Sequence, residues 1–184
     1  MTGSLRGAAS WHWLLLALVC VIGSAQAQTP VTLPGGRIYE GNLEDGEPYG
    51  LGTMVYPNGT RYQGEFVNGY REGRGTAVFY DASRYEGEWR NDIPHGRGVI
   101  QWPTGERYEG DIVENTRSGR GVMTLRDGTR YDGEWRDDTM NGDGVMTLPS
   151  GERYEGIFVN GEWRGPRTAN TGSREDTSTR SKGR

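Results

Sequence analysis

Residues 84–98 read RYEGEWRNDIPHGRG, and the first six letters of this stretch return along the chain with small changes. The other copies are RYQGEF at 61–66, RYEGDI at 107–112, RYDGEW at 130–135 and RYEGIF at 153–158. Segments repeated at one spacing indicate a tandem array, in which neighbouring units bury the apolar surface that a single unit leaves open. The sequence therefore predicts a repeat architecture.

The tyrosine of this motif recurs every 23 residues without a slip, at Tyr39, Tyr62, Tyr85, Tyr108, Tyr131 and Tyr154. A glycine follows each tyrosine two positions later, a large apolar residue follows at four positions, and another glycine at eleven. This register divides the chain into units 39–61, 62–84, 85–107, 108–130 and 131–153, followed by a partial unit 154–165.

Each unit carries two stretches in which polar and apolar residues alternate, which is the period of a β-strand with one wet face. Tyr85 and Trp89 share one face of the first stretch, and Ile100 and Trp102 share one face of the second, GVIQWP at 98–103. Glycine within a strand leaves room for an aromatic ring from a neighbouring strand. We expect an all-β fold of tandem β-hairpins that form one elongated, twisted antiparallel sheet, an open solenoid-like ribbon.

Turn signals separate the two strands of each unit. Asn58-Gly59 is a strong signal for a two-residue hairpin turn, because both central residues of such a turn need positive φ. Asp81-Ala82 stands at the same place in the next unit. A left-handed alanine costs about 1–2 kcal/mol, so we expect this turn to be distorted.

The alternation, the spacing and the glycine positions together resemble the MORN repeat, Y-x-G-x-[WF]-x-x-G-x-x-x-G-x-G with an Asp/Asn-Gly turn, over about residues 39–165. Residues 32–38 (TLPGGRI) look like the trailing half of a preceding unit. Leu43 and Ile112 depart from the pattern at the aromatic position, and Ala82 departs at the turn glycine. The resemblance implies a curved antiparallel sheet. It also implies membrane association, phospholipid binding or the scaffolding of protein assemblies.

The two ends of the chain differ from the repeats. Residues 1–27 combine a basic residue, Arg6, with an apolar stretch and a small-x-small site, which predicts a secretory signal peptide cleaved near Ala27. The protein would then be periplasmic or secreted, the alternative being a membrane anchor retained by an uncleaved signal. Residues 28–38 are expected to form a leading half-repeat, and residues 166–184 are expected to form a disordered basic tail.

Composition and charge agree with an extended body. The chain has 31 glycines and a mean hydropathy of −0.79. From Gln28 to Trp163, 14 arginines stand against 23 acidic residues, for a net charge of −9, whereas the segment from Arg164 onward is net +4. A negative body disfavours attraction to an anionic bilayer unless the basic tail supplies the contact. No nucleic-acid partner is expected.

The repeat leaves little room for catalysis or metal binding. His95 is the one histidine after the leader, and no nucleophile or orienting group recurs near it. GYREGRG at 69–75 lacks the context of a phosphate loop, and the carboxylates lack calcium-loop spacing. We expect arginines and acids such as Arg84 and Glu86 to form cross-strand charge ladders. The chain is predicted to be no enzyme and to hold no cofactor or metal.

Two functions fit the extended surface of the predicted repeat sheet. The first is a non-enzymatic extracytoplasmic scaffold or binding module for an unidentified protein partner. The alternative is a module for a membrane or envelope ligand, either an anionic phospholipid headgroup or a glycan, and a pure spacer stays open. The candidate binding residues are the groove aromatics Tyr39, Tyr62, Tyr85, Trp89, Trp102, Tyr108, Tyr131, Trp135 and Tyr154.

Overall fold

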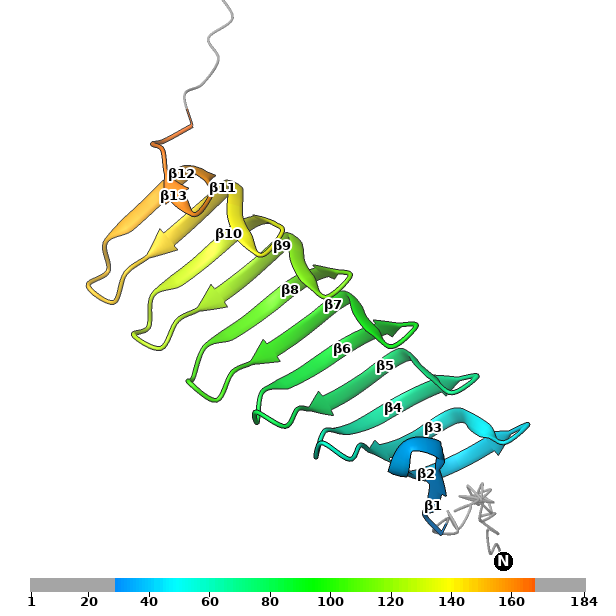
Figure 1. The fold of residues 1–184 in the computed structure, drawn as a ribbon. Coiled ribbons are helices and arrows are strands. Elements are labelled where there is room, and N and C mark those ends of the chain that lie inside the picture. The colour runs from blue at the N-terminus through cyan, green and yellow to red at the C-terminus, as the bar shows by residue number, and fades with distance from the viewer. Residues whose placement is uncertain (1–28, 168–184) are drawn as a thin grey trace, which may run out of the picture.

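The computed structural model describes residues 29–167, which form one antiparallel sheet of 13 strands in chain order (Figure 1). The strands are β1 (Val31–Leu33), β2 (Arg37–Glu44), β3 (Glu47–Val55), β4 (Arg61–Val67), β5 (Tyr70–Val78), β6 (Arg84–Arg90), β7 (Ile93–Gln101), β8 (Arg107–Val113), β9 (Thr116–Thr124), β10 (Arg130–Arg136), β11 (Thr139–Thr147), β12 (Arg153–Val159) and β13 (Glu162–Trp163). A short 3₁₀ turn, Pro34–Gly36, joins β1 to β2.

Every strand pairs with the next strand along the chain, and the sheet stays open at both ends. This confirms the predicted all-β ribbon of tandem hairpins. The predicted signal peptide and most of the predicted basic tail lie outside the described residues.

A row of glycines crosses the whole sheet at one level. Its members pair with one another strand by strand: Gly41, Gly52, Gly64, Gly75, Gly87, Gly98, Gly110, Gly121, Gly133, Gly144 and Gly156. The Tyr85 ring lies over two of them, because a Cβ at Gly87 would come 2.5 Å from its hydroxyl and one at Gly98 would come 2.7 Å from it. Only bare backbone admits the ring at this distance.

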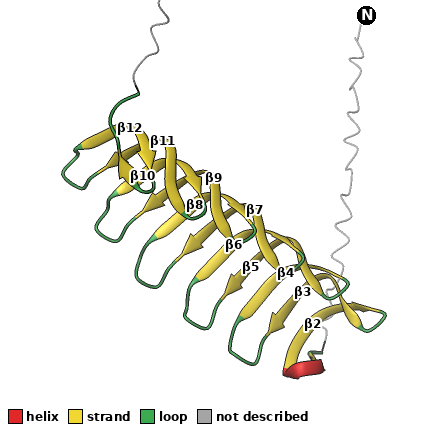
Figure 2. Cartoon of the chain, turned by 45° about the horizontal axis from the view of Figure 1, so that its top comes forward, coloured by secondary structure: helices red, strands yellow, loops and turns green. Residues whose placement is uncertain are grey.

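The strands bend just beyond the glycine row. The register of β6 and β7 shifts between Gly87 and Glu88, which marks a bulge. The Tyr85 hydroxyl donates to the Glu88 carbonyl at 2.7 Å and so holds the strand close to the ring. The same bond recurs at Tyr39, Tyr62, Tyr108 and Tyr131. The strands therefore bend at this level (Figure 2), and we call the face that carries the tyrosines the concave face.

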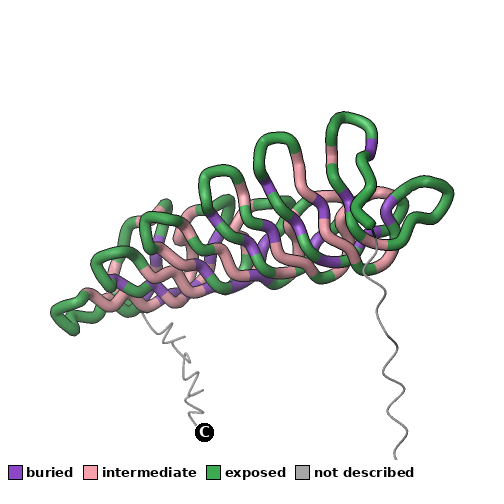
Figure 3. Tube along the Cα trace, turned by 90° about the horizontal axis from the view of Figure 1, so that it is seen from below, coloured by how far each residue is buried: buried purple, intermediate pink, exposed green. Residues whose placement is uncertain are grey.

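The rings of the concave face pack edge to face from one unit into the next. Tyr62 contacts Phe66 of its own unit at 5.0 Å between ring centres and Trp89 of the next unit at 5.2 Å. Tyr131 bridges Trp135 and Phe158 in the same way. Such ring pairs contribute beyond their buried area. Each unit thus completes the core of its neighbour, and buried residues run along the inside of the ribbon (Figure 3).

The turn at Ala82 is not distorted, contrary to the expectation from the sequence. Ala82 takes φ 65°, and its amide donates to the Phe79 carbonyl at 3.0 Å, the bond that the glycine turns also make. Asp81 holds the turn, because its Oδ1 accepts from the amide of Ser83 at 2.9 Å and from its hydroxyl at 2.6 Å. The dihedral strain is therefore carried by the alanine itself.

Ala82→Gly is expected to raise the free energy of unfolding by about 1 kcal/mol, since the removed left-handed strain exceeds the entropy that glycine adds to the unfolded chain. Urea denaturation followed by circular dichroism measures the change. The control is Ala77→Gly, at a buried position near the end of β5, which is expected to destabilise. A lower stability for Ala82→Gly would contradict the strain.

The opposite face, which we call the charged face, forms ion pairs mostly within strands. Arg84 Nη2 lies 2.6 Å from Glu86 Oε2, and the pairs Arg107–Glu109, Arg130–Asp132 and Arg153–Glu155 repeat this contact. The predicted cross-strand ladder is wrong for these pairs, because Arg84 lies opposite Val78 and Gln101 in the register. Arg97 and Asp111 do pair across strands, at 3.3 Å. Exposed pairs of this kind contribute about 0–1 kcal/mol each.

Candidate binding surface on the concave face

The two arms of the bent sheet approach each other across the concave face. Arg71 lies opposite Phe66 in the register, and the Tyr56 amide bonds to the Thr60 carbonyl, six residues from Phe66. On a flat sheet these levels would be about 20 Å apart. The guanidinium of Arg71 nevertheless lies 5.7 Å from the centre of the Tyr56 ring. The side chain of Arg71 therefore spans the bend.

Arg71 is held there by an aspartate and a tryptophan of the next unit. Its Nε donates to Asp92 Oδ1 at 2.9 Å, and its Nη2 donates to the Asp92 carbonyl at 2.8 Å. The guanidinium lies 4.2 Å from the centre of the Trp89 ring, within cation–π range. Trp89 Nε1 donates to the Gly75 carbonyl at 3.2 Å. These contacts tie two neighbouring units together.

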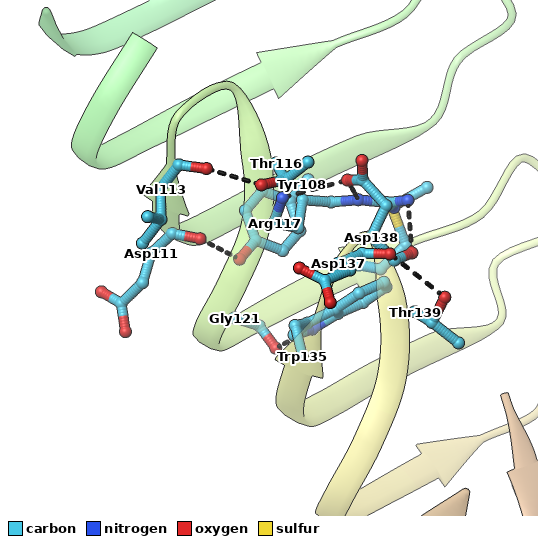
Figure 4. A network of polar contacts seen from close by, with 11 residues as sticks. Tyr108, Asp111, Val113, Thr116, Arg117, Gly121, Trp135, Asp137, Asp138 and Thr139 are labelled. Atoms are coloured by element: carbon cyan, nitrogen blue, oxygen red, sulfur yellow. Dashed lines mark hydrogen bonds and ion pairs between the residues drawn. The ribbon is translucent and has the colours of Figure 1, made fainter. Parts of the chain in front are cut away.

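The same cluster occurs a second time, 46 residues along the chain (Figure 4). Arg117 Nε donates to Asp138 Oδ1 at 2.7 Å, and its Nη2 donates to the Asp138 carbonyl at 2.8 Å. The guanidinium lies 4.5 Å from the Trp135 ring, and Trp135 Nε1 donates to the Gly121 carbonyl at 3.1 Å. The arginine cluster thus occurs in the second and the fourth unit, two units apart.

The sequence interpretation missed these two arginine clusters. Other units carry different residues at the arginine position: Pro48, Pro94, Met140 and Trp163. A 23-residue comparison therefore does not reveal the arginine. A comparison at 46 residues does, because arginine, tryptophan and aspartate all recur at that distance.

The predicted binding aromatics fall into two groups. Tyr39, Tyr62, Tyr85, Trp89, Tyr108, Tyr131 and Trp135 are buried, with exposed fractions of 7% or less. Trp102 and Tyr154 are partly exposed and pack against this core. The seven buried rings are covered by one another and by the arginines, so a ligand can reach only the outer two directly. A binding role for any of the nine stays a prediction.

The buried tyrosines act as neutral hydrogen-bond donors. Burial raises the pKa of Tyr108 and of Tyr131 to about 12, and it raises the pKa of Tyr62 and Tyr85 as well. Their hydroxyls therefore keep their protons at neutral pH and keep donating to the backbone. This is a structural use of tyrosine.

A strip of partly exposed side chains forms the accessible lining of the concave face. One position of the repeat supplies it, with Tyr56, Phe79, Trp102, Leu125 and Leu148. Arg117 lies beside these residues, since its guanidinium lies 6.0 Å from the centre of the Trp102 ring. We call these five side chains the apolar strip. It runs along the ribbon and crosses five units.

Chemistry-bearing side chains are dispersed over the described residues. Between residues 29 and 167, no three of histidine, cysteine, aspartate and glutamate come together in a way that would hold a metal ion. His95 is half-buried and lies opposite Glu88 in the register of β6 and β7. Within the same range, no helix has the length and apolar content needed to cross a bilayer.

Comparison with known proteins identifies the repeat. The MORN repeat matches five times in succession, at residues 39–61, 62–84, 85–107, 108–130 and 131–153. Comparison with curated proteins finds no match.

Two solved structures are among those to which the chain is similar. One is the TCP domain of SAS-4 (dCPAP) from Drosophila melanogaster in complex with a proline-rich motif of Ana2, at 14% identity over 86% of this chain and 99% of that chain, with a TM-score of 0.42. The other is the TCP10 domain of CPAP from Danio rerio, at 18% identity over 68% and 71%, with a TM-score of 0.32. With five matched repeats over most of its length, the chain belongs to the MORN repeat family.

Proposed function

We propose that the protein is a non-enzymatic extracytoplasmic scaffold whose concave face binds a segment of another protein. The observation that carries this proposal is the apolar strip, which one repeat position extends across five units. A row of exposed and partly exposed apolar side chains along one face is the kind of surface that marks interaction sites on soluble proteins. Its elongated form suits an extended or helical segment rather than a small molecule. The extracytoplasmic location rests on the predicted signal peptide.

An envelope ligand is the alternative function. A glycan would need exposed ring faces, and only Trp102 and Tyr154 of the predicted aromatics are accessible. An anionic headgroup would meet a body whose net charge is −9 between Gln28 and Trp163. The buried rings and this charge favour a protein partner.

Site-specific photo-crosslinking in cells tests the proposal. A benzoylphenylalanine placed at Phe79 or Leu148, in the apolar strip, is expected to give a discrete protein adduct. The matched controls are Val99 and Thr124, on the charged face, where no such adduct should form. Equal adducts on both faces would overturn the proposal. The proposal would also be overturned if the protein sedimented with phosphatidylglycerol vesicles and substitution of Phe79 abolished this sedimentation. That result would favour the lipid alternative.

A further inference from the structure

The charged face changes character at its N-terminal end. One row of this face runs across β2, β3, β4 and β5 through paired residues Ile38, Val55, Arg61 and Val78. Later strands carry Arg84, Gln101, Arg107 and Thr124 in the same row. The apolar members are accessible, because Ile38 is 46% exposed and Val78 is 42% exposed.

Leu51 extends this patch along β3. It is 73% exposed, although it is a leucine within a strand. The same repeat position is Arg74, Arg97 and Arg120 in the next three units. The later units thus carry a charged residue at this position, with Asp143 in the fifth unit, and leucine occurs only in the first unit. We call Ile38, Leu51, Val55 and Val78 the N-terminal patch.

Two charges within the patch lack the partners that later units supply. Arg84, Arg107, Arg130 and Arg153 each pair with the acid two residues on. Ile38 replaces the arginine before Glu40, and Gln63 replaces the acid after Arg61. Neither Glu40 nor Arg61 forms an ion pair within residues 29–167. Glu40 and Arg61 are two strands apart, about 10 Å, so they do not pair with each other within one chain.

We propose that the N-terminal patch binds the same patch of a second copy of this chain. A two-fold axis between the two copies, inclined to β3 and passing between Thr53 and Val55, would lay Glu40 of each copy over Arg61 of the other. Arg61 of one copy would then face Glu40 of its partner, twice by symmetry, and the apolar side chains between them would be covered. An isologous contact requires such self-complementarity. One unpaired cation and one unpaired anion on either side of β3 provide it.

This surface lies on the charged face and does not depend on the concave binding surface. The patch is small, so the dimer belongs at the weak end of specific interfaces. It is expected to form at micromolar concentrations and to dissociate on dilution.

Sedimentation velocity of the purified protein between about 1 and 200 μM tests the dimer, since this range brackets micromolar association. The weight-average mass is expected to rise toward twice the monomer mass. Leu51→Arg with Val78→Thr, residues that later units carry at these positions, is expected to weaken association at least tenfold. Because both side chains are exposed, the fold should persist, and circular dichroism checks this.

A charge exchange separates direct pairing from general surface effects. Arg61→Glu and Glu40→Arg are each expected to weaken the dimer, and the double variant is expected to restore it. Arg130→Glu, in the same row of a later unit, is the control and should leave the mass unchanged. A protein that stays monomeric at every concentration would overturn the proposal. The proposal would also be overturned if the double variant did not restore the dimer. It would be overturned as well if Leu51→Arg changed binding to phosphatidylcholine vesicles and left the dimer intact.

Discussion

Gly87→Ala is expected to lower the free energy of unfolding by about 3 kcal/mol, the upper end of overpacking effects. The added Cβ would lie 2.5 Å from the Tyr85 hydroxyl, 2.6 Å from the Arg97 carbonyl oxygen and 2.6 Å from Gly98 Cα. Two of these atoms belong to the backbone of β7, which the sheet holds in place. The ring or the strand must move, and either movement breaks contacts with the next unit. Urea denaturation followed by circular dichroism measures the loss.

Gly151→Ala is the matched control for this substitution. Gly151 has φ 87°, and no atom lies within 4 Å of a Cβ built there. Alanine at this turn therefore costs only its dihedral strain, about 1–2 kcal/mol. The comparison separates crowding from backbone strain, because Gly87 does not have a left-handed φ. A loss at Gly87 no greater than at Gly151 would contradict the idea that the glycine row exists to seat the tyrosine rings.

The glycine row and the hairpins could be predicted from the sequence because they are set by local periodicity. Tyr85, Gly87 and Trp89 alternate with charged residues, and alternation at two residues fixes the face on which each side chain lies. A row of glycines beside a row of aromatic residues on the same face then predicts that each ring lies over a glycine. The structure places the rings there.

The features that were not predicted depend on contacts between units. Arg71 is unremarkable in its own unit and acquires its role from Asp92 and Trp89 of the next one. Ala82 keeps its turn because the Asp81 side chain supports it, which a propensity argument omits. Arg84 pairs with Glu86 because its cross-strand neighbours are uncharged, and that follows only from the register.

The candidate site shows the same division. The sequence places nine aromatic residues on one face, and alternation alone does not distinguish a ring in a core from a ring in a groove. The bend of the strands decides this, since it covers Tyr62 and Trp89 and leaves Trp102 at the outer edge. The bend arises from the bulges and tyrosine hydroxyl bonds beyond the glycine row, which are properties of paired strands.

Trp89→Ala is expected to lower the free energy of unfolding by about 4 kcal/mol, within the range for removal of a buried aromatic side chain. Trp89 is 3% exposed and makes edge contacts with Tyr62 at 5.2 Å and Tyr85 at 5.1 Å. Its loss also removes the bond to the Gly75 carbonyl and the cover over Arg71. Thermal unfolding followed by circular dichroism measures the effect.

Trp89→Ile is the matched variant, because the chain itself carries Ile112 at the equivalent position of the next unit. Isoleucine fills part of the volume but offers no ring to Arg71 and no donor to Gly75. It is expected to cost about half as much as alanine, since the transfer and cavity losses shrink with the volume removed. An equal cost for both variants would mean that the arginine contact and the hydrogen bond, rather than packing, dominate at this position.

A double-mutant cycle between Arg71 and Trp89 isolates the contact between units. Two groups 4.2 Å apart and largely shielded from water are expected to couple by about 1 kcal/mol. The matching cycle between Arg117 and Trp135 should give the same value, because that cluster has the same hydrogen bonds and a 4.5 Å separation. Arg71 with Trp135 is the control cycle, and these residues belong to different clusters. If the Arg71–Trp89 coupling is no larger than that of the control, then the arginine occupies the bend without holding the arms together, and the two-unit repeat has no mechanical role.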